Sequence, residues 1–155
     1  MDGRSAYFVT AEWTILMRSA ASMPKSAHTP SDVATILERA RRQFVLGCAD
    51  YDNFVDCLAT AFKAIEMLLQ QCAEAKPGKP ETLGQLITRC QSQGLLTGHE
   101  FEYLDKFVRR FRNKLAHPKG PIAFTPGMSE EALTGCHRFV AQFSDRHAAR
   151  LARQP

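Results

Sequence analysis

Apolar residues return every three or four positions along most of this chain, and the clearest run lies between residues 51 and 74. Side chains three or four positions apart lie on the same face of an α-helix. The run consists of Phe54, Leu58, Phe62, Ile65, Leu69 and Cys72. This spacing predicts one helix over residues 51–74 that buries a narrow face.

A second apolar stripe predicts a helix over residues 31–47. Either Thr29 or Ser31 offers a side chain that can cap its N-terminus, and Pro30 suits a first helical position. The helix is expected to end near Gly47. The stripe is formed by Val33, Ile36, Leu37, Ala40 and Phe44.

Start signals predict two further helices. Thr82 and Gln85 form a capping box, in which each side chain accepts a hydrogen bond from the other residue's backbone N–H, and this opens a helix over 82–93. Ser129 opens the last helix, over 129–151, because two glutamates follow it where the helix dipole favours negative charge. The inner face of this last helix is expected to hold Leu133, Val140, Phe143, His147 and Leu151.

A second capping box, Thr97 with Glu100, opens a helix over residues 98–117. Pro118 disfavours helical geometry at the residue before it, so His117 is expected to end this helix. The apolar stripe of the helix contains Phe101, Leu104, Val108, Phe111 and Leu115.

No segment alternates apolar and polar residues at the period of a strand, which predicts an all-α fold: four main helices closed by a C-terminal helix. We expect two parts, an N-terminal arm over residues 1–30 and a helical domain over residues 31–155. The arm is expected to hold a short amphipathic helix and a mobile polar linker. The apolar positions of that helix are Val9, Trp13, Leu16, Met17 and Ala20.

Composition narrows the class of protein. With 155 residues, 45% of them hydrophobic and 23% charged, the chain has the make-up of one globular domain. Its apolar runs are too short for a signal peptide or a membrane span. Five cysteines are present without a C-x-x-C pair, so we expect reduced thiols and a cytoplasmic protein. The net charge of +4 makes an anionic partner plausible.

Positive charge is concentrated in the stretch "FVRRFRNKLAHPKG", residues 107–120. It contains five lysines and arginines, one asparagine and one histidine, and no acid. Like charges one helical turn apart repel each other, so helix stability does not explain the run. On a helical projection, the side chains that point away from the apolar stripe are Lys106, Arg109, Arg110, Asn113 and His117.

Within this stretch, "RNKLAH", Arg112 to His117, resembles the motif of HEPN domains. That motif is an arginine, then a polar residue that is often asparagine, and a histidine four to six residues after the arginine. HEPN domains are small α-helical bundles in which the motif ends a late helix. The resemblance covers roughly residues 31–150, and the segment is similar to bacterial HEPN variants of defence and regulatory systems, which include the mannitol-operon-repressor type.

The resemblance implies metal-independent cleavage of RNA, in which the ribose 2′-hydroxyl attacks the adjacent phosphate. His117 would be the general acid or base, Arg112 would hold the phosphate oxygens, and Asn113 would orient the histidine or the phosphate. Such a protein is expected to be the toxin or effector of a defence or toxin–antitoxin system. The alternative is a noncatalytic HEPN-like module that binds a regulatory protein or an antitoxin.

Family members commonly build the site across a homodimer, and Phe107, Ile122 and Phe124 are candidates for sealing that interface. The side chains expected to contact RNA are Lys106, Arg109, Arg110, Lys114 and Lys119. A plain solvated helix face explains these cations equally well.

Other polar residues give weaker signals. Glu66 and Glu38 are candidate acids for pairing with Arg112. A second basic patch of Arg39, Arg41 and Arg42 would extend an RNA track, or is simply a solvated face. Neither a cofactor nor a metal site is expected, because the spacing of His28, His99, His137 and His147 matches no metal-binding pattern.

Overall fold

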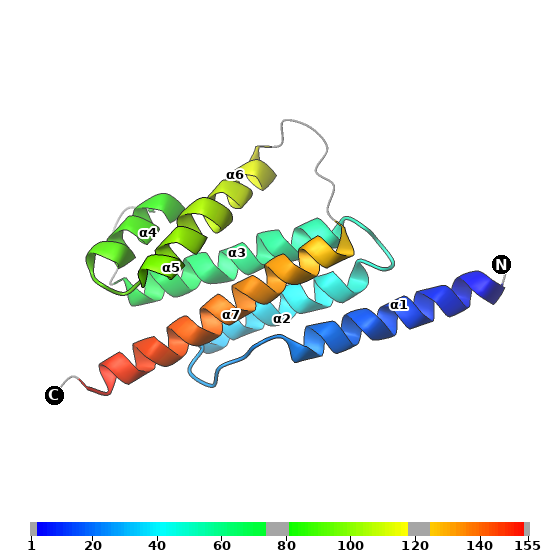
Figure 1. Cartoon of the computed structure of the whole chain (residues 1–155), viewed down its shortest axis with the longest axis horizontal. Coiled ribbons are helices and arrows are strands. Elements are labelled where there is room, and N and C mark those ends of the chain that lie inside the picture. Colours follow the sequence, from blue (N-terminus) through cyan, green and yellow to red (C-terminus); the bar gives the residue numbers. More distant parts are fainter. Residues whose placement is uncertain (1–2, 74–80, 118–124, 154–155) are drawn as a thin grey trace.

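Helix α3, Asn53–Cys72, lies at the centre of an arrangement of helices in the computed structural model (Figure 1). The structure describes residues 3–73, 81–117 and 125–153, with side chains from residue 12 onward, and within these ranges it contains no strand. The all-α prediction is confirmed. The other elements are α1 (Gly3–Ser22), α2 (Ser31–Leu46), α4 (Leu83–Ser92), α5 (Gly98–Glu102), η1 (Tyr103–Arg109), α6 (Arg110–Ala116) and α7 (Pro126–Leu151).

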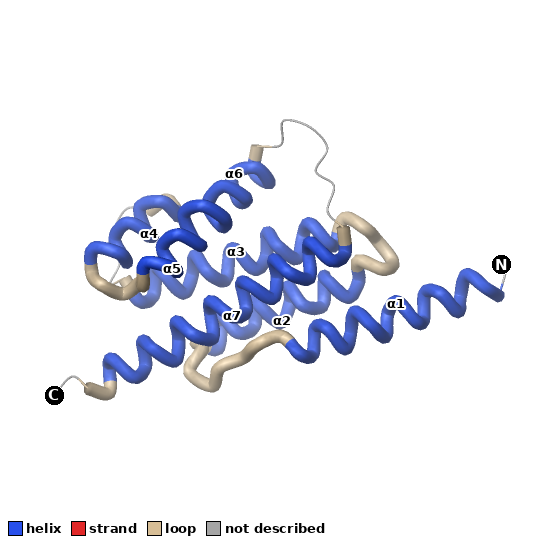
Figure 2. The backbone as a smooth tube through the Cα atoms, in the orientation of Figure 1, coloured by secondary structure: helices blue, strands red, loops and turns tan. Residues whose placement is uncertain are grey.

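The helices form two groups around α3. Helices α2, α3 and α7 pack against one another, and α1 packs on α2. Helix α4 and the segment from α5 to α6 cover another side of α3. Figure 2 shows these two groups and the connections between the helices, with the start of α1 far from the end of α7. No helix in the described part of the chain is long and apolar enough to cross a lipid bilayer.

The turn between α2 and α3 depends on close packing at Gly47. A Cβ atom at this position would lie only 2.5 Å from the ring of Phe54. Phe54 is fully buried and meets the ring of Phe44 edge-on at a centroid distance of 5.7 Å. Glycine at the end of α2 therefore lets the first turn of α3 approach the core.

Local start signals were predicted with mixed success. Both capping boxes are present, Thr82 with Gln85 and Thr97 with Glu100. The expected cap of α2 by Thr29 or Ser31 is wrong: Pro30 occupies the N-cap position and offers no side-chain acceptor. Within the first turn, the backbone N–H of Val33 instead donates a hydrogen bond of 2.8 Å to the carboxylate of Asp32. Proline is tolerated there because its φ of −52° is compatible with a helix start and its missing N–H is not needed for an intrahelical bond.

Helix α7 begins earlier than expected, because Thr125 caps it and Pro126 occupies its first turn. Ser129, the predicted cap, instead lies inside the helix, is buried, and donates a hydrogen bond of 2.8 Å to the Phe54 carbonyl. Leu151, expected on the inner face, is 53% exposed because α7 extends beyond the helices that cover it.

The N-terminal helix is longer than the short helix expected, and its C-terminal half joins the core. Leu16 and Ala20 are buried there, and so is Met23 directly after the helix. The Ala20 carbonyl accepts a hydrogen bond of 2.9 Å from Nε of Arg41 on α2. In the connection that follows α1, Ser26 donates a hydrogen bond to Asp145 of α7. The last turns of α1 and the linker are thus tied to the rest of the fold.

The predicted helix over 98–117 is a single run of helix with an unexpected wide part in its middle. Its first and last parts, α5 and α6, are α-helical, whereas η1 has the broader turns of a π-helix. Such turns bring side chains four or five positions apart nearly into line. Tyr103, Phe107 and Phe111 form a stack with centroid distances of 5.5 and 5.4 Å.

Helix α7 also carries a buried histidine, His137, which faces the connection after α1. Only 2% of this residue is exposed. Burial is the main cause that lowers the pKa of His137 to about 4, and the neighbouring Arg41 charge lowers it as well. The imidazole is therefore neutral in the folded protein at physiological pH.

This burial predicts a pH-dependent stability. In the unfolded chain the pKa of His137 is about 6.5, so between pH 6.5 and pH 4 the unfolded state binds more protons. Above that pH range the neutral ring makes its full contribution to the free energy of unfolding. This contribution is lost as the pH falls through the range. We expect His137 alone to lower the free energy of unfolding by about 2 kcal/mol between pH 7 and pH 5 in urea titrations.

Two variants separate this effect from other titrating groups. His137→Gln should remove most of the extra loss at pH 5, whereas His99→Gln, at an exposed position, should leave it unchanged. An identical pH dependence in wild type and His137→Gln would contradict the prediction.

Candidate functional site

The candidate site lies at the C-terminal end of α6. The helix ends at Ala116, and His117 leaves helical geometry with φ −133° and ψ 68°. Its backbone N–H still donates a hydrogen bond of 3.0 Å to the carbonyl of Asn113. The prediction that His117 ends the helix is confirmed.

Asn113 and His117 lie one turn apart, and both are exposed to solvent. Within the described part of the chain, no hydrogen bond joins the side chains of Arg112, Asn113 and His117. The side chains of Arg112 and Asn113 point in different directions, because successive residues of an α-helix are rotated by about 100° about its axis. The amide and the imidazole are therefore both accessible to a ligand from solvent.

Arg112 turns toward α3 instead. Its Nη2 lies 2.7 Å from Oε2 of Glu66, and this ion pair joins α6 to the middle of α3. The Arg112 side chain is 42% exposed and that of Glu66 is 18% exposed. Of the two acids that were predicted as candidate partners of Arg112, Glu66 is the one that pairs with it. Glu38 is not, because it pairs with Arg41 on its own helix at 2.9 Å.

The ion pair stands at the edge of a groove of about 620 Å³ between α3 and α6. The groove combines apolar walls with polar side chains along its edge. Lys63, Glu66 and Gln70 recur at helical spacing on α3, beside the apolar stripe. Sequence reasoning connected Glu66 with the motif but missed Lys63 and Gln70. The remaining lining residues are Ala59, Phe62, Met67, Arg112 and Leu115.

The N-terminal part of the predicted RNA face has acidic partners. Lys106 lies 2.9 Å from Glu102, and Arg109 lies 3.1 Å from Asp105. A hydrogen bond from Lys106 and its charge lower the pKa of Glu102. Arg109 also lies against α4, where a Cβ at Gly84 would be 3.3 Å from its Nη1. These cations are held by neighbouring elements, and part of their charge is balanced.

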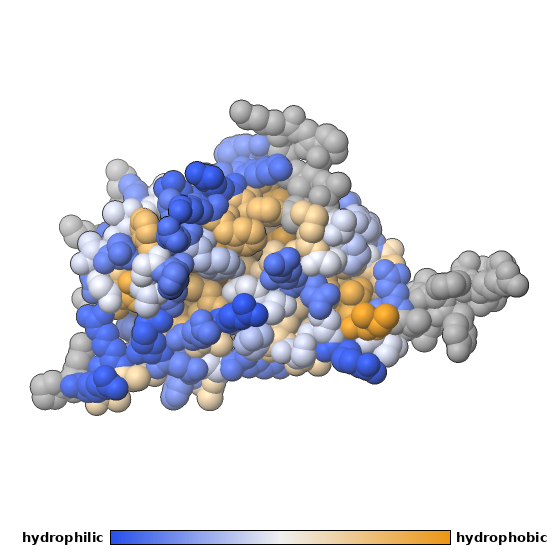
Figure 3. Space-filling view, viewed as in Figure 1, coloured by the Kyte–Doolittle hydropathy of each residue, from blue (hydrophilic) through white to orange (hydrophobic). Residues whose placement is uncertain are grey.

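Uncompensated positive charge is therefore concentrated nearer the motif. Arg110 and Lys114 are exposed, and neither forms an ion pair with a described residue. Lys119 lies outside the described residues. Figure 3 shows hydrophilic side chains along the outer edge of the α5–α6 segment and an apolar strip between this segment and α7.

The second predicted basic patch lies away from α6. Arg41 is buried, whereas Arg39 and Arg42 are exposed. All three line a cavity between α2, α7 and the connection after α1, together with Lys25 and His137. Sequence reasoning missed this grouping, because its members come from three separate segments.

Other reactive groups are placed as follows. All five cysteines are free thiols. Burial raises the pKa of Cys57 and of Cys136 to about 12, so neither is a thiolate at neutral pH. Among the described residues, no group of three or more histidine, cysteine, aspartate or glutamate side chains is arranged to hold a metal ion.

A comparison with known proteins identifies no relative of this chain. Neither a protein-family model, nor a curated protein, nor a solved structure matches this chain. The HEPN resemblance consequently rests on the motif itself, on its place at the end of a late helix, and on the all-α frame around it.

Proposed function

We propose that this chain is a metal-independent endoribonuclease of the HEPN type, whose site is Arg112, Asn113 and His117. The observation that carries the proposal is the exposed His117 at the end of α6, beside Asn113 and near two cations, Arg110 and Lys114, that form no ion pair with a described residue. An arginine held by an acid from another helix completes the set. We propose the role of toxin or effector in a defence or toxin–antitoxin system.

The chemistry requires proton transfer and charge stabilisation. A base removes the proton of the ribose 2′-hydroxyl, whose oxygen attacks phosphorus, and an acid protonates the departing 5′-oxygen. The products are a 2′,3′-cyclic phosphate and a 5′-hydroxyl end. An imidazole suits either transfer because its ordinary pKa lies near neutrality. Solvent exposure gives His117 access to an RNA strand.

Arg112 can exchange its partner when RNA binds. A half-exposed ion pair contributes only about 0–1 kcal/mol, so Glu66 restrains the guanidinium without trapping it. A phosphate offers the same bidentate geometry as a carboxylate. Arg110 and Lys114 would attract the strand to this end of α6 through its charge.

One observation favours the second candidate, a noncatalytic module that binds a regulatory protein or an antitoxin. The guanidinium of Arg112 faces Glu66 on α3, while His117 lies at the exposed helix end. An arginine engaged in this way also serves as a link between two helices. In that case the groove between α3 and α6 would receive a partner's side chains.

We further propose a homodimer, in which two α6 ends combine into one site. What supports it is an apolar groove of about 470 Å³ between η1–α6 and α7, lined by Phe107, Phe111 and the half-exposed Met128. Ile122 and Phe124, the other expected interface residues, lie outside the described residues. A second copy would also supply the second proton-transfer group.

Light scattering tests the dimer. We expect about twice the 17.3 kDa mass of one chain at micromolar concentration. Replacing Met128 by a charged residue, Met128→Glu, should shift the population to monomers, whereas Ile15→Glu on α1 should not. A wild-type protein that remains monomeric would remove the basis of a shared site.

Substitutions at the motif test the nuclease. Loss of a proton-transfer group costs about 10² to 10⁴ in rate, so His117→Ala should abolish most RNA cleavage with unchanged helicity by circular dichroism. Asn113→Ala should lose less, because an orienting hydrogen bond contributes about 0.5–1.5 kcal/mol. Cleavage should survive EDTA, and the fragments should end in a 2′,3′-cyclic phosphate.

His99→Ala is a matched control, since His99 is an exposed histidine away from the motif. Equal activity of wild type and His117→Ala would rule out the nuclease. An inactive wild-type dimer on varied RNAs would leave the binding module as the remaining proposal.

Glu66→Gln tests the exchange of partners. If Glu66 only restrains Arg112, this variant should keep its cleavage rate within about tenfold, while Arg112→Ala should lose at least about a hundredfold. Glu102→Gln makes the same charge change at another ion pair and serves as the control. Equal losses in Glu66→Gln and Arg112→Ala, with intact folds, would show that the pair acts as a unit.

A further inference from the structure

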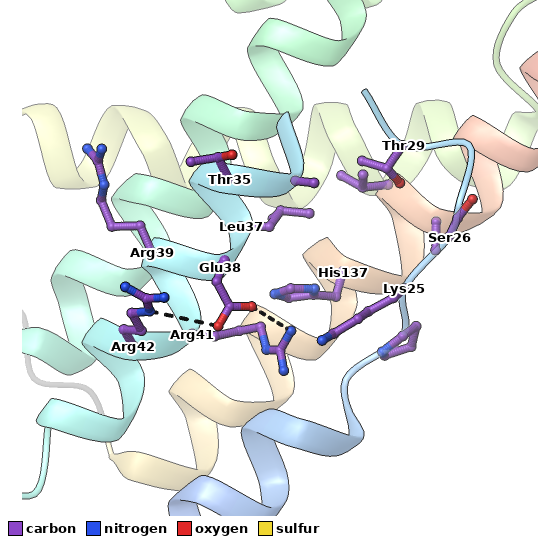
Figure 4. Close-up of a pocket in the computed structure, with 14 residues that line it drawn as sticks. Lys25, Ser26, Thr29, Thr35, Leu37, Glu38, Arg39, Arg41, Arg42 and His137 are labelled. Carbon is purple, nitrogen blue, oxygen red and sulfur yellow. Dashed lines mark hydrogen bonds and ion pairs between the residues drawn. The ribbon is translucent and has the colours of Figure 1, made fainter. Parts of the chain in front are cut away.

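A second cavity lies on the side of the molecule formed by α2, α7 and the connection after α1. Its volume is about 600 Å³, within the range of pockets that hold small molecules. Figure 4 shows side chains from all three segments pointing toward the same space. The cavity shares no lining residue with the groove beside Arg112.

His137 gives this cavity a polar atom without a partner. The residue is only 2% exposed, and its Nε2 is buried with no hydrogen-bond partner in the described part of the chain. The backbone carbonyl of Pro24 also forms a hydrogen bond with this imidazole. Because Nε2 has no partner, Nδ1 is the nitrogen that serves Pro24. Nε2 of the neutral ring is then left with an unpaired lone pair beside the cavity.

Buried polar atoms in folded proteins almost always have a partner. The lone pair of Nε2 calls for a donor, such as a ligand hydroxyl. In Figure 4 the ring of His137 lies between Glu38 and Lys25, at the edge of the space that these side chains surround.

Arg41 is fixed beside the histidine. It is 8% exposed, and it donates from Nε to the Ala20 carbonyl and from Nη1 to Glu38, each at 2.9 Å. These two bonds set the plane of the guanidinium before any ligand arrives. A preordered donor of this kind loses little conformational entropy on binding.

Charge in the cavity lining is strongly unbalanced. Four cationic side chains line it, and Glu38 is the single carboxylate among the lining residues. Glu38 already pairs with Arg41 at 2.9 Å and lies 3.9 Å from Arg42. The hydroxyl groups of Ser26 and Thr29 add neutral donors. A doubly charged anion therefore suits the lining better than a single carboxylate.

We propose that this cavity binds a small phosphorylated molecule that also carries a hydroxyl group. Lys25, Arg41 and Arg42 face its phosphate, and its hydroxyl donates to Nε2 of His137. The site is a binding site for a ligand and is separate from the motif on α6. The ligand contacts α2, α7 and the connection after α1. Its binding therefore also stabilises the packing of these three segments against one another.

Calorimetric titration and thermal unfolding, both at constant ionic strength, test the proposal with glycerol 3-phosphate as the probe. We expect saturable binding and a higher melting temperature. Lys25→Gln and Arg42→Gln, both at exposed positions, should weaken binding by about tenfold each, as expected for a lost charge-assisted hydrogen bond. Arg138→Gln, an exposed cation of α7 outside the lining, should change nothing.

Three comparison ligands test the chemistry. Methyl phosphate has no hydroxyl and should bind several-fold more weakly than glycerol 3-phosphate, while glycerol alone should not bind. Malonate carries two carboxylates. Malonate binding as tight as that of glycerol 3-phosphate would overturn the assignment to phosphate.

His137→Leu removes the Nε2 acceptor and should abolish the preference for glycerol 3-phosphate over methyl phosphate. Should this variant fail to fold, the preference in the wild type decides the question alone. No preference in the wild type would overturn the role of His137. Absence of binding at about 10 mM of either phosphate, well above the millimolar Kd of a weak site, would overturn the proposal. A third result would also overturn the proposal: single-stranded RNA binds, Lys25→Gln weakens that binding, and the small phosphates do not bind.

Discussion

Helix α3 must bury more of its surface than any single neighbour can cover, and the architecture follows from this requirement. Its buried residues face several directions, toward α2 and α7 on one side and toward α4 and α6 on the other. Burial of a large aliphatic or aromatic side chain stabilises a fold by about 1.5–3 kcal/mol. The two helix groups are therefore both attached to α3, and little of the chain's core exists without it.

The candidate site is a consequence of this attachment. Helix α6 lies on α3 through Phe111, whose ring meets Phe62 at a centroid distance of 5.9 Å. At the edge of that contact, Glu66 is still partly exposed and can receive Arg112. The apolar packing thus decides which acid pairs with the arginine, while His117 is left at the free end of the helix. One helix end supplies both a link to the core and an exposed imidazole.

The sequence was informative where the determinant is local. The stripe from Phe54 to Leu69 predicted α3 closely, and both capping boxes were found, because each depends on residues three or four apart. The start of α7 was predicted at Ser129 and not at Thr125, because the two glutamates after Ser129 are the more conspicuous start signal. The π-helical turns of η1 have no comparable local signature. They accompany a stack of aromatic rings against α7, where Tyr103 reaches Cys136 at 3.6 Å.

Features that depend on tertiary neighbours were harder to predict. The charge run around Arg110 appeared free of acids, yet Glu102 and Asp105, one turn earlier, pair with two of the cations next to it. Glu66 could be named as one of two partners of Arg112, but only the packing of α6 on α3 separates it from Glu38. The cavity around His137 is formed by three segments that are separate in the sequence. The hydrophobic periodicity of any one of these segments therefore does not predict it.

The central claim is that RNA contacts Arg112 and His117 together, and a nuclear magnetic resonance titration tests it most directly. A short 2′-O-methyl oligonucleotide binds without being cleaved, because its 2′-oxygen cannot attack. We expect the Nε–Hε signal of Arg112 and the ring signals of His117 to shift along one binding curve, with little change at His99. Shifts confined to other surfaces, or an Arg112 signal that does not move while His117 responds, would contradict the claim.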